Sequence, residues 1–230
     1  MNKEKLLDEN SKHALQSDNI IAITNRHLCS RPFMEQLERV CKLHPHAIVL
    51  REKDMPEAEY LSLARDVIAL CKKYAVQCML HSFINVAMEL EHPYIHLPLP
   101  ILEAYVKKNV SGNISTGMSK STDNYQQFFK VIGTSVHSVE DAIKAEQLGA
   151  TYMTAGHIFA TDCKKGLPPR GLDFLKNVCD AVGIPVYAIG GINIASNNNS
   201  TASDSPSTYD AVPDISVPRL ADVMKCGAAG

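Results

Sequence analysis

The stretch that decides the fold reads 131-VIGTSVHSVEDAIKAEQLGATYMTAGHIF-159. Val131–Val136 is an apolar run rich in β-branched residues, which predicts a buried strand. Ser138 is a good helix cap and Gly149 a good stop signal, so together they predict a helix over Val139–Leu148. Tyr152–Phe159 predicts a second strand. A strand, a helix and a strand in this order indicate parallel pairing through a right-handed crossover.

The same alternation extends in both directions from this unit. Further strands are predicted at Ile20–Thr24, Ala47–Leu50, Gln77–Leu80, Tyr94–Leu97 and Pro185–Ile189. Helices are predicted at Phe33–Leu43, from Pro56 onward, and at Phe83–Glu89, Pro100–Lys107 and Gly171–Val182. The polar segment Ser111–Tyr125 is predicted to be a loop, with room for one strand at Ile114–Met118.

Strands and helices that alternate along the chain predict an α/β fold. Two architectures are open, a (β/α)8 TIM barrel and an open doubly wound sheet. No Gly-x-Gly-x-x-Gly follows the first strand, and 230 residues is close to the typical barrel length of ~250, so we expect the barrel. Residues 1–19 are interpreted as a polar lead-in, and residues 20–230 as a single TIM-barrel domain.

The C-terminal part departs from this pattern in two ways. Residues 193–210 are rich in Asn, Ser and Thr, which predicts a low-complexity loop after the seventh strand, on the active-site face of a barrel. A helix is predicted at Val217–Lys225, and Cys226–Gly230 resembles a lead into one more strand. Seven strands do not close a barrel with the usual stagger. We therefore expect a truncation before the eighth strand, or a partner chain or rearrangement that covers the gap.

The composition argues against several classes of protein. Lys plus Arg total 23 and Asp plus Glu 25, a formal net charge of −2, and only 6% of residues are aromatic, so a nucleic-acid partner is not expected. No apolar run approaches the ~20 residues of a membrane span, and the N-terminus lacks a secretory signal. The seven cysteines contain no Cys-x-x-Cys, which favours a reduced, cytoplasmic compartment.

The reacting groups of an α/β barrel come from the C-terminal ends of its strands. His137 follows the fifth strand, and an imidazole can accept and return a proton near neutral pH. Arg51 and Lys53 lie two residues apart in an extended segment, so both face one side, where they would suit a carboxylate or a phosphate. Lys164 and Lys165 are interpreted in the same way. A solvated charged loop is the alternative for both pairs.

Gly190 and Gly191 end the seventh predicted strand. Without Cβ atoms their backbone can approach an anion closely, and successive N–H groups form an anion-binding nest. An ordinary Gly-Gly turn is the alternative interpretation. Because barrel phosphate sites gather after strands seven and eight, we expect these glycines to bind phosphate.

A metal site is not expected. Histidines occur at four successive strand ends, namely His81, His96, His137 and His157. No carboxylate accompanies them, although a metal would favour such ligands. His44 and His46 have metal-like spacing but enter the second strand from the opposite face. Cys163 beside Lys164 has no evident base, which favours a passive thiol over a nucleophile.

Five segments together resemble the thiamine-phosphate synthase/TenI superfamily. They are Val49–Lys53, Ser135–Ser138, Gly156–Phe159, Thr161–Gly166 and Ala188–Ile192. The resemblance runs from about Ile20 to Ile192 and again over Val217–Gly227, and the block Gly133–Gly166 is most similar to the thiazole tautomerase (TenI) branch. It implies a (β/α)8 barrel, in agreement with the pattern of the elements.

The two branches of this superfamily imply different chemistry. The synthase couples a pyrimidine diphosphate with a thiazole phosphate using Mg²⁺, whereas the tautomerase isomerises a thiazole carboxylate phosphate. The synthase pattern has Gln where this chain has Val49, Asn-Asp where it has His81-Ser82, and a second metal-binding Asp where it reads His96–Pro100. Its Thr-x-Thr-Lys is here Thr161–Lys164. A diphosphate needs a divalent cation held by carboxylates, and both expected carboxylates are missing.

The resemblance therefore implies a thiazole tautomerase with His137 as general base and then general acid. Six further residues are expected to bind the phosphorylated thiazole, namely Arg51, Lys53, Thr161, Lys164, Gly190 and Gly191. Among them the glycines would hold the phosphate, and Arg51 and Lys53 the carboxylate. No cofactor is expected, and Mg²⁺ only for a synthase. Two alternatives stay open, a thiamine-phosphate synthase and a non-catalytic barrel that binds a phosphorylated ligand; a homo-oligomer is also open.

Overall fold

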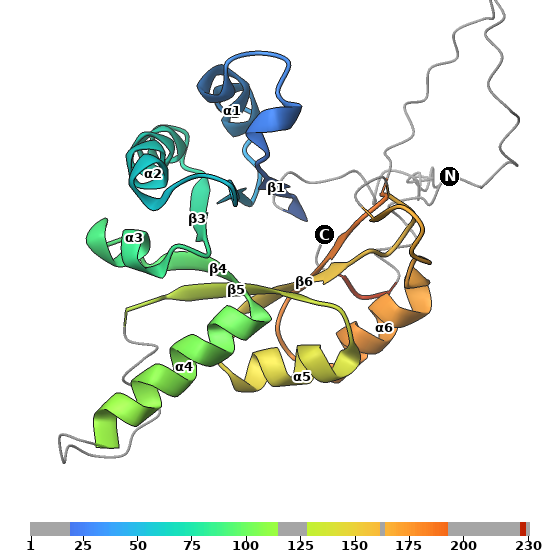
Figure 1. Ribbon diagram of the computed structural model, residues 1–230. Helices are drawn as coiled ribbons and strands as arrows, with labels where there is room; N and C mark the ends of the chain where they lie inside the picture. Colours follow the sequence, from blue (N-terminus) through green and yellow to red (C-terminus); the bar gives the residue numbers. More distant parts are fainter. Residues whose placement is uncertain (1–18, 115–127, 162–163, 193–225, 229–230) are drawn as a thin grey trace, which may run out of the picture.

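Parallel strands and helices alternate through the computed structural model, which describes residues 19–114, 128–161, 164–192 and 226–228 (Figure 1). The strands are β1 (Ile21–Ile23), β2 (Ala47–Leu50), β3 (Gln77–His81), β4 (Tyr94–Pro98), β5 (Val131–Val136), β6 (Tyr152–Gly156) and β7 (Val186–Ile189). The helices are α1 (Phe33–Cys41), α2 (Glu57–Lys73), α3 (Ile84–Glu89), α4 (Leu99–Ile114), α5 (Val139–Gln147) and α6 (Gly171–Ala181), with a 3-10 turn η3 (Arg26–Leu28).

The seven strands form one parallel sheet in chain order, β1 to β7. In Figure 1 the sheet curves around an interior, and the helices lie along its outer side. This is a nearly closed (β/α) barrel, and within the described residues it lacks the eighth unit, so the expected fold is confirmed. No helix in this part of the chain combines the length and the apolar character needed to cross a bilayer.

Side-chain alternation along the strands produces two apolar regions. Outward-facing residues such as Ile48, Leu80 and Met153 pack in the large core between sheet and helices. Inward-facing residues form a smaller cluster inside the barrel, made of Ala47, Val49, Met79, Tyr152 and Tyr187. Successive side chains of a strand point to opposite faces, so alternate residues enter the outer core and the interior cluster.

The β5–α5–β6 unit forms as its sequence predicts. The Ser138 side chain accepts a hydrogen bond from the Asp141 backbone N–H (3.0 Å), which caps α5. Ala142 and Ala145 are the residues that α5 buries, and their small size lets the helix lie close to the sheet. Gly149 adopts a φ of 89°, the left-handed conformation that ends a helix.

Gly133 on β5 makes room for a large residue of the neighbouring strand. It is the register partner of Tyr152 on β6, and a Cβ at Gly133 would collide with the Tyr152 ring. The ring can therefore cross β5 and fill the interior, where it contacts Tyr187 at 5.9 Å between ring centroids. A glycine inside a strand commonly marks such a close approach.

Three expected boundaries are wrong. Strand β6 ends at Gly156 rather than Phe159, because His157 has a φ of 63°, which an extended strand does not allow. Strand β4 continues to Pro98, so His96 lies within it and not at its end. Helix α4 runs from Leu99 to Ile114, so Ser111 to Ile114 are helical and not a loop.

The length of α4 has a physical reason. Leu102 and Val106 are buried, and this packing stabilises a helix that then extends over weak helix formers. The rest of the expected loop 111–125 and strand 114–118 lies outside the described residues, as do most of the lead-in 1–19, the loop 193–210 and the helix 217–225.

We predict that Gly133→Ala lowers the free energy of unfolding by about 1–3 kcal/mol, the usual cost of overpacking, because its Cβ meets the Tyr152 ring. Gly183→Ala is the matched control, since a Cβ there has only an ordinary contact with Glu146 at 3.5 Å. Urea unfolding of both variants measures the difference. Equal stabilities would contradict the packing of Tyr152 over Gly133.

Candidate functional site

Polar side chains replace apolar ones on the inner face toward the carboxyl ends of the strands. His81 pairs in register with His96, and Ser135 with Thr154, so these four residues form a polar layer across β3 to β6. Each lies an even number of residues along its strand from a residue that faces the interior, such as Met79, Tyr94 or Tyr152, and so faces the same side. This end of the barrel is the one on which an α/β barrel builds its site.

The His96 imidazole is the centre of this layer. Its Nδ1 lies 2.9 Å from the Tyr152 hydroxyl, and its Nε2 lies 2.9 Å from Ser135 Oγ. Ser135 Oγ also accepts a hydrogen bond from Thr154 Oγ1 (2.9 Å). Burial lowers the pKa of His96 to about 3, because the charged form loses its hydration there. His96 therefore stays neutral, with both ring nitrogens engaged.

His81 lies against His96 and under the cations of the β2 loop. The two rings stack at 5.7 Å between centroids, and Ser82 Oγ lies 2.8 Å from His81 Nδ1. Burial, then the nearby charges of Arg51 and Lys53, lower the pKa of His81 to about 4. Arg51 and Lys53 thus converge on a buried, neutral imidazole.

A buried carboxylate fixes the loop that carries these two cations. Glu52 is 2% exposed and accepts hydrogen bonds from Thr24 Oγ1 (2.7 Å) and from the Arg26 guanidinium (3.1 Å). Thr24 Oγ1 in turn accepts the Arg51 backbone N–H at 2.9 Å. A turn begins at Lys53, so the segment is not extended throughout, and the charges of both Arg51 and Lys53 act on the His81 imidazole.

His137 lies directly after β5, with its ring over Gly156 of β6. A Cβ at Gly156 would be only 2.7 Å from His137 Cε1 and 3.0 Å from Nδ1, so glycine is what lets the ring lie there. His137 is exposed to solvent. Partial burial of the ring, then the charges of Lys164 and Arg170, lower its pKa, and Asp141 opposes them. A neutral, accessible imidazole at neutral pH is suited to proton transfer.

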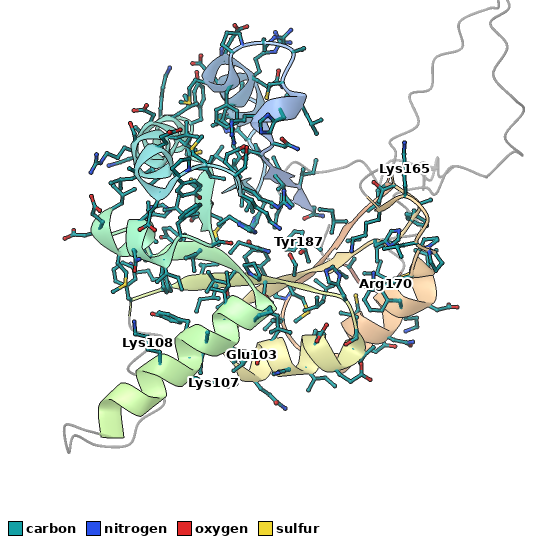
Figure 2. All side chains as sticks on the ribbon, viewed as in Figure 1. Glu103, Lys107, Lys108, Lys165, Arg170 and Tyr187 are labelled. Atoms are coloured by element: carbon teal, nitrogen blue, oxygen red, sulfur yellow. The ribbon has the colours of Figure 1, made fainter. Side chains whose placement is uncertain are left out.

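The loop from β6 to α6 supplies the cations beside His137. The Lys164 backbone N–H donates to the Thr161 carbonyl (3.0 Å), so Thr161 and Lys164 share one turn. Arg170 Nε donates to the His137 carbonyl at 2.8 Å. Figure 2 shows Arg170 at the start of α6 and Lys165 on the loop before it, with Tyr187 among the strands.

Gly190 and Gly191 lie against the backbone that follows β6. Their φ values are 108° and 67°, and a Cβ on Gly190 would be 2.9 Å from the Cα of His157. The Phe159 N–H donates to the Gly190 carbonyl at 2.9 Å. This packing alone requires glycine, so phosphate binding at the pair stays a prediction.

The expected site residues form two groups. The first group is Arg51 and Lys53, whose charges act on His81. The second group is His137 and Lys164, with Thr161 and Gly190 in the segments next to them. The chain of hydrogen bonds from His96 through Ser135 to Thr154 runs beneath both groups.

The sequence analysis gave no role in the site to Gly156, Arg170 or Ser135, which the structure places there. Gly156 could have been found, because a glycine within a strand indicates a close approach. Arg170 and Ser135 had no such signal, since their contacts depend on the tertiary structure. Cys163 lies outside the described residues. His157 is not part of a strand, contrary to expectation, because its backbone is left-handed.

The donor atoms at this end of the barrel do not fit Mg²⁺. A hard cation favours carboxylate oxygens, but β3 and β4 present imidazoles and a hydroxyl. The buried carboxylate of Glu52 is already bound by Thr24 and Arg26. In the part of the chain that the structure describes, no three His, Cys, Asp or Glu side chains gather as a metal site. The expectation of a site without metal stays a prediction.

We predict that buried histidines make this protein less stable in acid. The folded-state pKa values of His81 (about 4) and His96 (about 3) lie below the ordinary value of about 6.5. Between these values the unfolded chain binds more protons, so stability falls as the pH falls. Each histidine contributes up to about 1.4 kcal/mol per pH unit.

His96→Gln should flatten this dependence between pH 6.5 and 4.5, measured as the free energy of unfolding in urea. The control is His44→Asn, an exposed position whose φ of 48° suits asparagine. A slope equal to that of the unmodified chain would contradict the burial of a neutral His96.

Comparison with known proteins gives consistent matches. A family model described as thiamine monophosphate synthase matches residues 20–204. The chain is 35% identical over 173 residues to a putative thiamine-phosphate synthase 2 of Aquifex aeolicus, which covers 75% of this chain and 84% of the relative. It is 30% identical over 175 residues to a thiamine-phosphate synthase of Caldanaerobacter subterraneus subsp. tengcongensis, covering 76% and 75%.

A solved structure of a thiamine phosphate pyrophosphorylase from Pyrococcus furiosus superposes on this chain with a TM-score of 0.58. The sequence identity is 26%, and the match covers 77% of this chain and 78% of the other.

Proposed function

This chain belongs to the thiamine monophosphate synthase family, and from its site we propose that it is the thiamine-biosynthesis enzyme that isomerises a thiazole carboxylate phosphate. The observation that carries this proposal is His137, an accessible imidazole over Gly156 with a lowered pKa. The tautomerase branch is favoured by this ring and by the imidazole and hydroxyl groups of β3 and β4, in a place where a metal-dependent coupling would need carboxylates.

The reaction needs a group that removes a proton from the ligand ring and returns it at another position. A neutral ring nitrogen of His137 can accept the proton, and the resulting imidazolium can donate it back. Lys164 and Arg170 lower the pKa of His137, which keeps the imidazole in its accepting form at neutral pH. Their positive charges also stabilise an anionic ligand and the negative charge that develops when the proton leaves.

The remaining expected residues would hold the two ends of the ligand. Arg51 and Lys53 would bind the carboxylate, and the neutral His81 beneath them avoids a third positive charge. Gly190 and Gly191 would bind the phosphate through their backbone, with Thr161 and Lys164 beside them. No step of this mechanism passes through a metal ion.

Thiamine-phosphate synthase activity is the second candidate, and the names of the relatives favour it. Two clusters of cations could also bind a diphosphate. Against it stands the donor set at β3 and β4, which does not suit Mg²⁺. Supplying pyrimidine diphosphate, thiazole phosphate and Mg²⁺ decides between the two: formation of thiamine phosphate would establish the synthase.

We predict that His137→Asn lowers the turnover of the thiazole carboxylate phosphate by about 10²–10⁴-fold, the usual contribution of a general acid–base group. Gly156→Ala should also lower turnover, because its Cβ displaces the ring. Gly183→Ala, whose added Cβ makes only an ordinary contact, should keep it. Wild-type turnover in His137→Asn would refute the assignment of His137 as the base.

The pH dependence of kcat/KM should follow the titration of the His137 imidazole. Because the pKa of His137 is lowered, kcat/KM should rise with pH through a midpoint below about 6.5. Lys164→Met removes a positive charge near the ring, so the midpoint should move to higher pH. Lys144→Met is the control, since Lys144 pairs with Glu103 (2.7 Å), and it should leave the midpoint unchanged. A midpoint that stays fixed in Lys164→Met contradicts the electrostatic argument.

A further inference from the structure

Positive and negative side chains alternate in the loop after β2, which reads Arg51-Glu52-Lys53-Asp54. Charges of opposite sign attract each other, so such a loop could neutralise itself. It does not: within the described residues neither Arg51 nor Lys53 forms a salt bridge, although each stands beside a carboxylate in the sequence. The two carboxylates must therefore be held by other groups.

Arg26, on the 3-10 turn after β1, holds both carboxylates. Its guanidinium donates to Glu52 Oε2 at 3.1 Å, and to the two oxygens of Asp54 at 2.8 Å and 2.6 Å. Its backbone N–H also donates to both Glu52 oxygens at 3.2 Å. The contact with both oxygens of Asp54 uses the planar fork of arginine, which a lysine does not have.

Two further side chains bind these carboxylates from the same direction. Thr24 Oγ1 donates to Glu52 at 2.7 Å, and His27 Nε2 lies 2.9 Å from Asp54 Oδ2. Like Arg26, both residues belong to the end of β1 and the turn that follows it. The acidic half of the loop thus has its partners on the β1 side.

The two cations act on the opposite neighbour. The charges of Arg51 and Lys53 reach the His81 imidazole at the end of β3. Partial burial, then the positive charge of Arg51, lowers the pKa of Lys53, in spite of the carboxylates on either side of it in the sequence. The basic half of the loop therefore carries charge that no described acidic side chain pairs with.

We propose that Arg26 is a positioning residue that sorts the charges of this loop. By holding both carboxylates on the β1 side, it leaves the two cations available to an anionic ligand. Glu52 is 2% exposed, so water could not compensate its charge if Arg26 were removed, and that charge would attract the cations and repel the ligand. The identity of the ligand rests on the proposed function, whereas the separation of the charges does not.

Removal of the guanidinium from the full chain tests this role. Arg26→Met should raise KM for the thiazole carboxylate phosphate about tenfold and leave kcat within about threefold, because it weakens binding rather than the chemical step. Arg65→Met is the matched control, since Arg65 pairs with Glu89 (3.2 Å) where both side chains are exposed, and it should change neither constant. An unchanged KM in Arg26→Met overturns the proposal.

A second substitution separates charge from packing. When Arg26→Met is combined with Glu52→Gln, the uncompensated charge is gone, while the amide oxygen can still accept the Thr24 hydroxyl. KM should then return to within about threefold of its value in the unmodified chain. A KM that stays raised in the folded double variant shows that Arg26 acts through packing alone, which also overturns the proposal.

The Lys53 ammonium gives a measurement that needs no substrate. In protein labelled with ¹³C-lysine, NMR titration should show a higher Lys53 pKa in Arg26→Met, because an uncompensated carboxylate stabilises the charged form, and its return in the double variant. Arg26→Lys keeps a positive charge without the fork, so it should cause a smaller rise. If Arg26→Met does not fold, this smaller rise in Arg26→Lys is the required result. A Lys53 pKa that stays fixed, or that rises as far in Arg26→Lys as in Arg26→Met, contradicts charge sorting.

The two proposals fail in different ways. The expected rise in the Lys53 pKa, without any turnover of the thiazole carboxylate phosphate by the unmodified chain, removes the proposed function and keeps the role of Arg26. Turnover that needs His137, combined with a KM and a Lys53 pKa that are indifferent to Arg26, removes the role of Arg26 alone.

Discussion

The register between β5 and β6 is the constraint on which the rest of the site depends. It places Gly133 opposite Tyr152 and Ser135 opposite Thr154, and one step further along the pair it brings His137 over Gly156. Each glycine removes a side chain where a ring of the neighbouring strand must pass. A slip of β6 by one residue would turn Tyr152 and Thr154 toward the helices and remove both from the interior.

Electrostatics divides the mouth of the barrel into two positive regions. Arg51 and Lys53 gather over His81 on the β2–β4 side, and Lys164 and Arg170 gather around His137 and His157 on the β5–β6 side. Between them the neutral His96 engages both of its nitrogens with hydroxyl groups. A ligand with an anionic group at each end would match this distribution, as a carboxylate phosphate does.

Family membership and the side chains of the site answer different questions about this protein: the first gives its relatives, and the second the reaction it can perform. Relatives named as synthases match about three quarters of this chain, whose donor atoms on β3 and β4 and directly after β3 are imidazole and hydroxyl groups. The family model and the relatives show which family the chain belongs to, whereas the fold leaves the reaction open. The side chains at the strand ends decide which reaction is possible, because charge compensation and proton transfer require different groups.

The sequence by itself determined the alternation of strands and helices, the two ends of α5 and the position of His137 directly after β5. These features follow from local periodicity and from residues with strong conformational preferences. The tertiary structure decided the end of β6, the interior position of His96, and the grouping of Arg170 and His157 around His137. These depend on contacts between residues far apart in the chain, and spacing along a sequence carries no information on which side chains then meet.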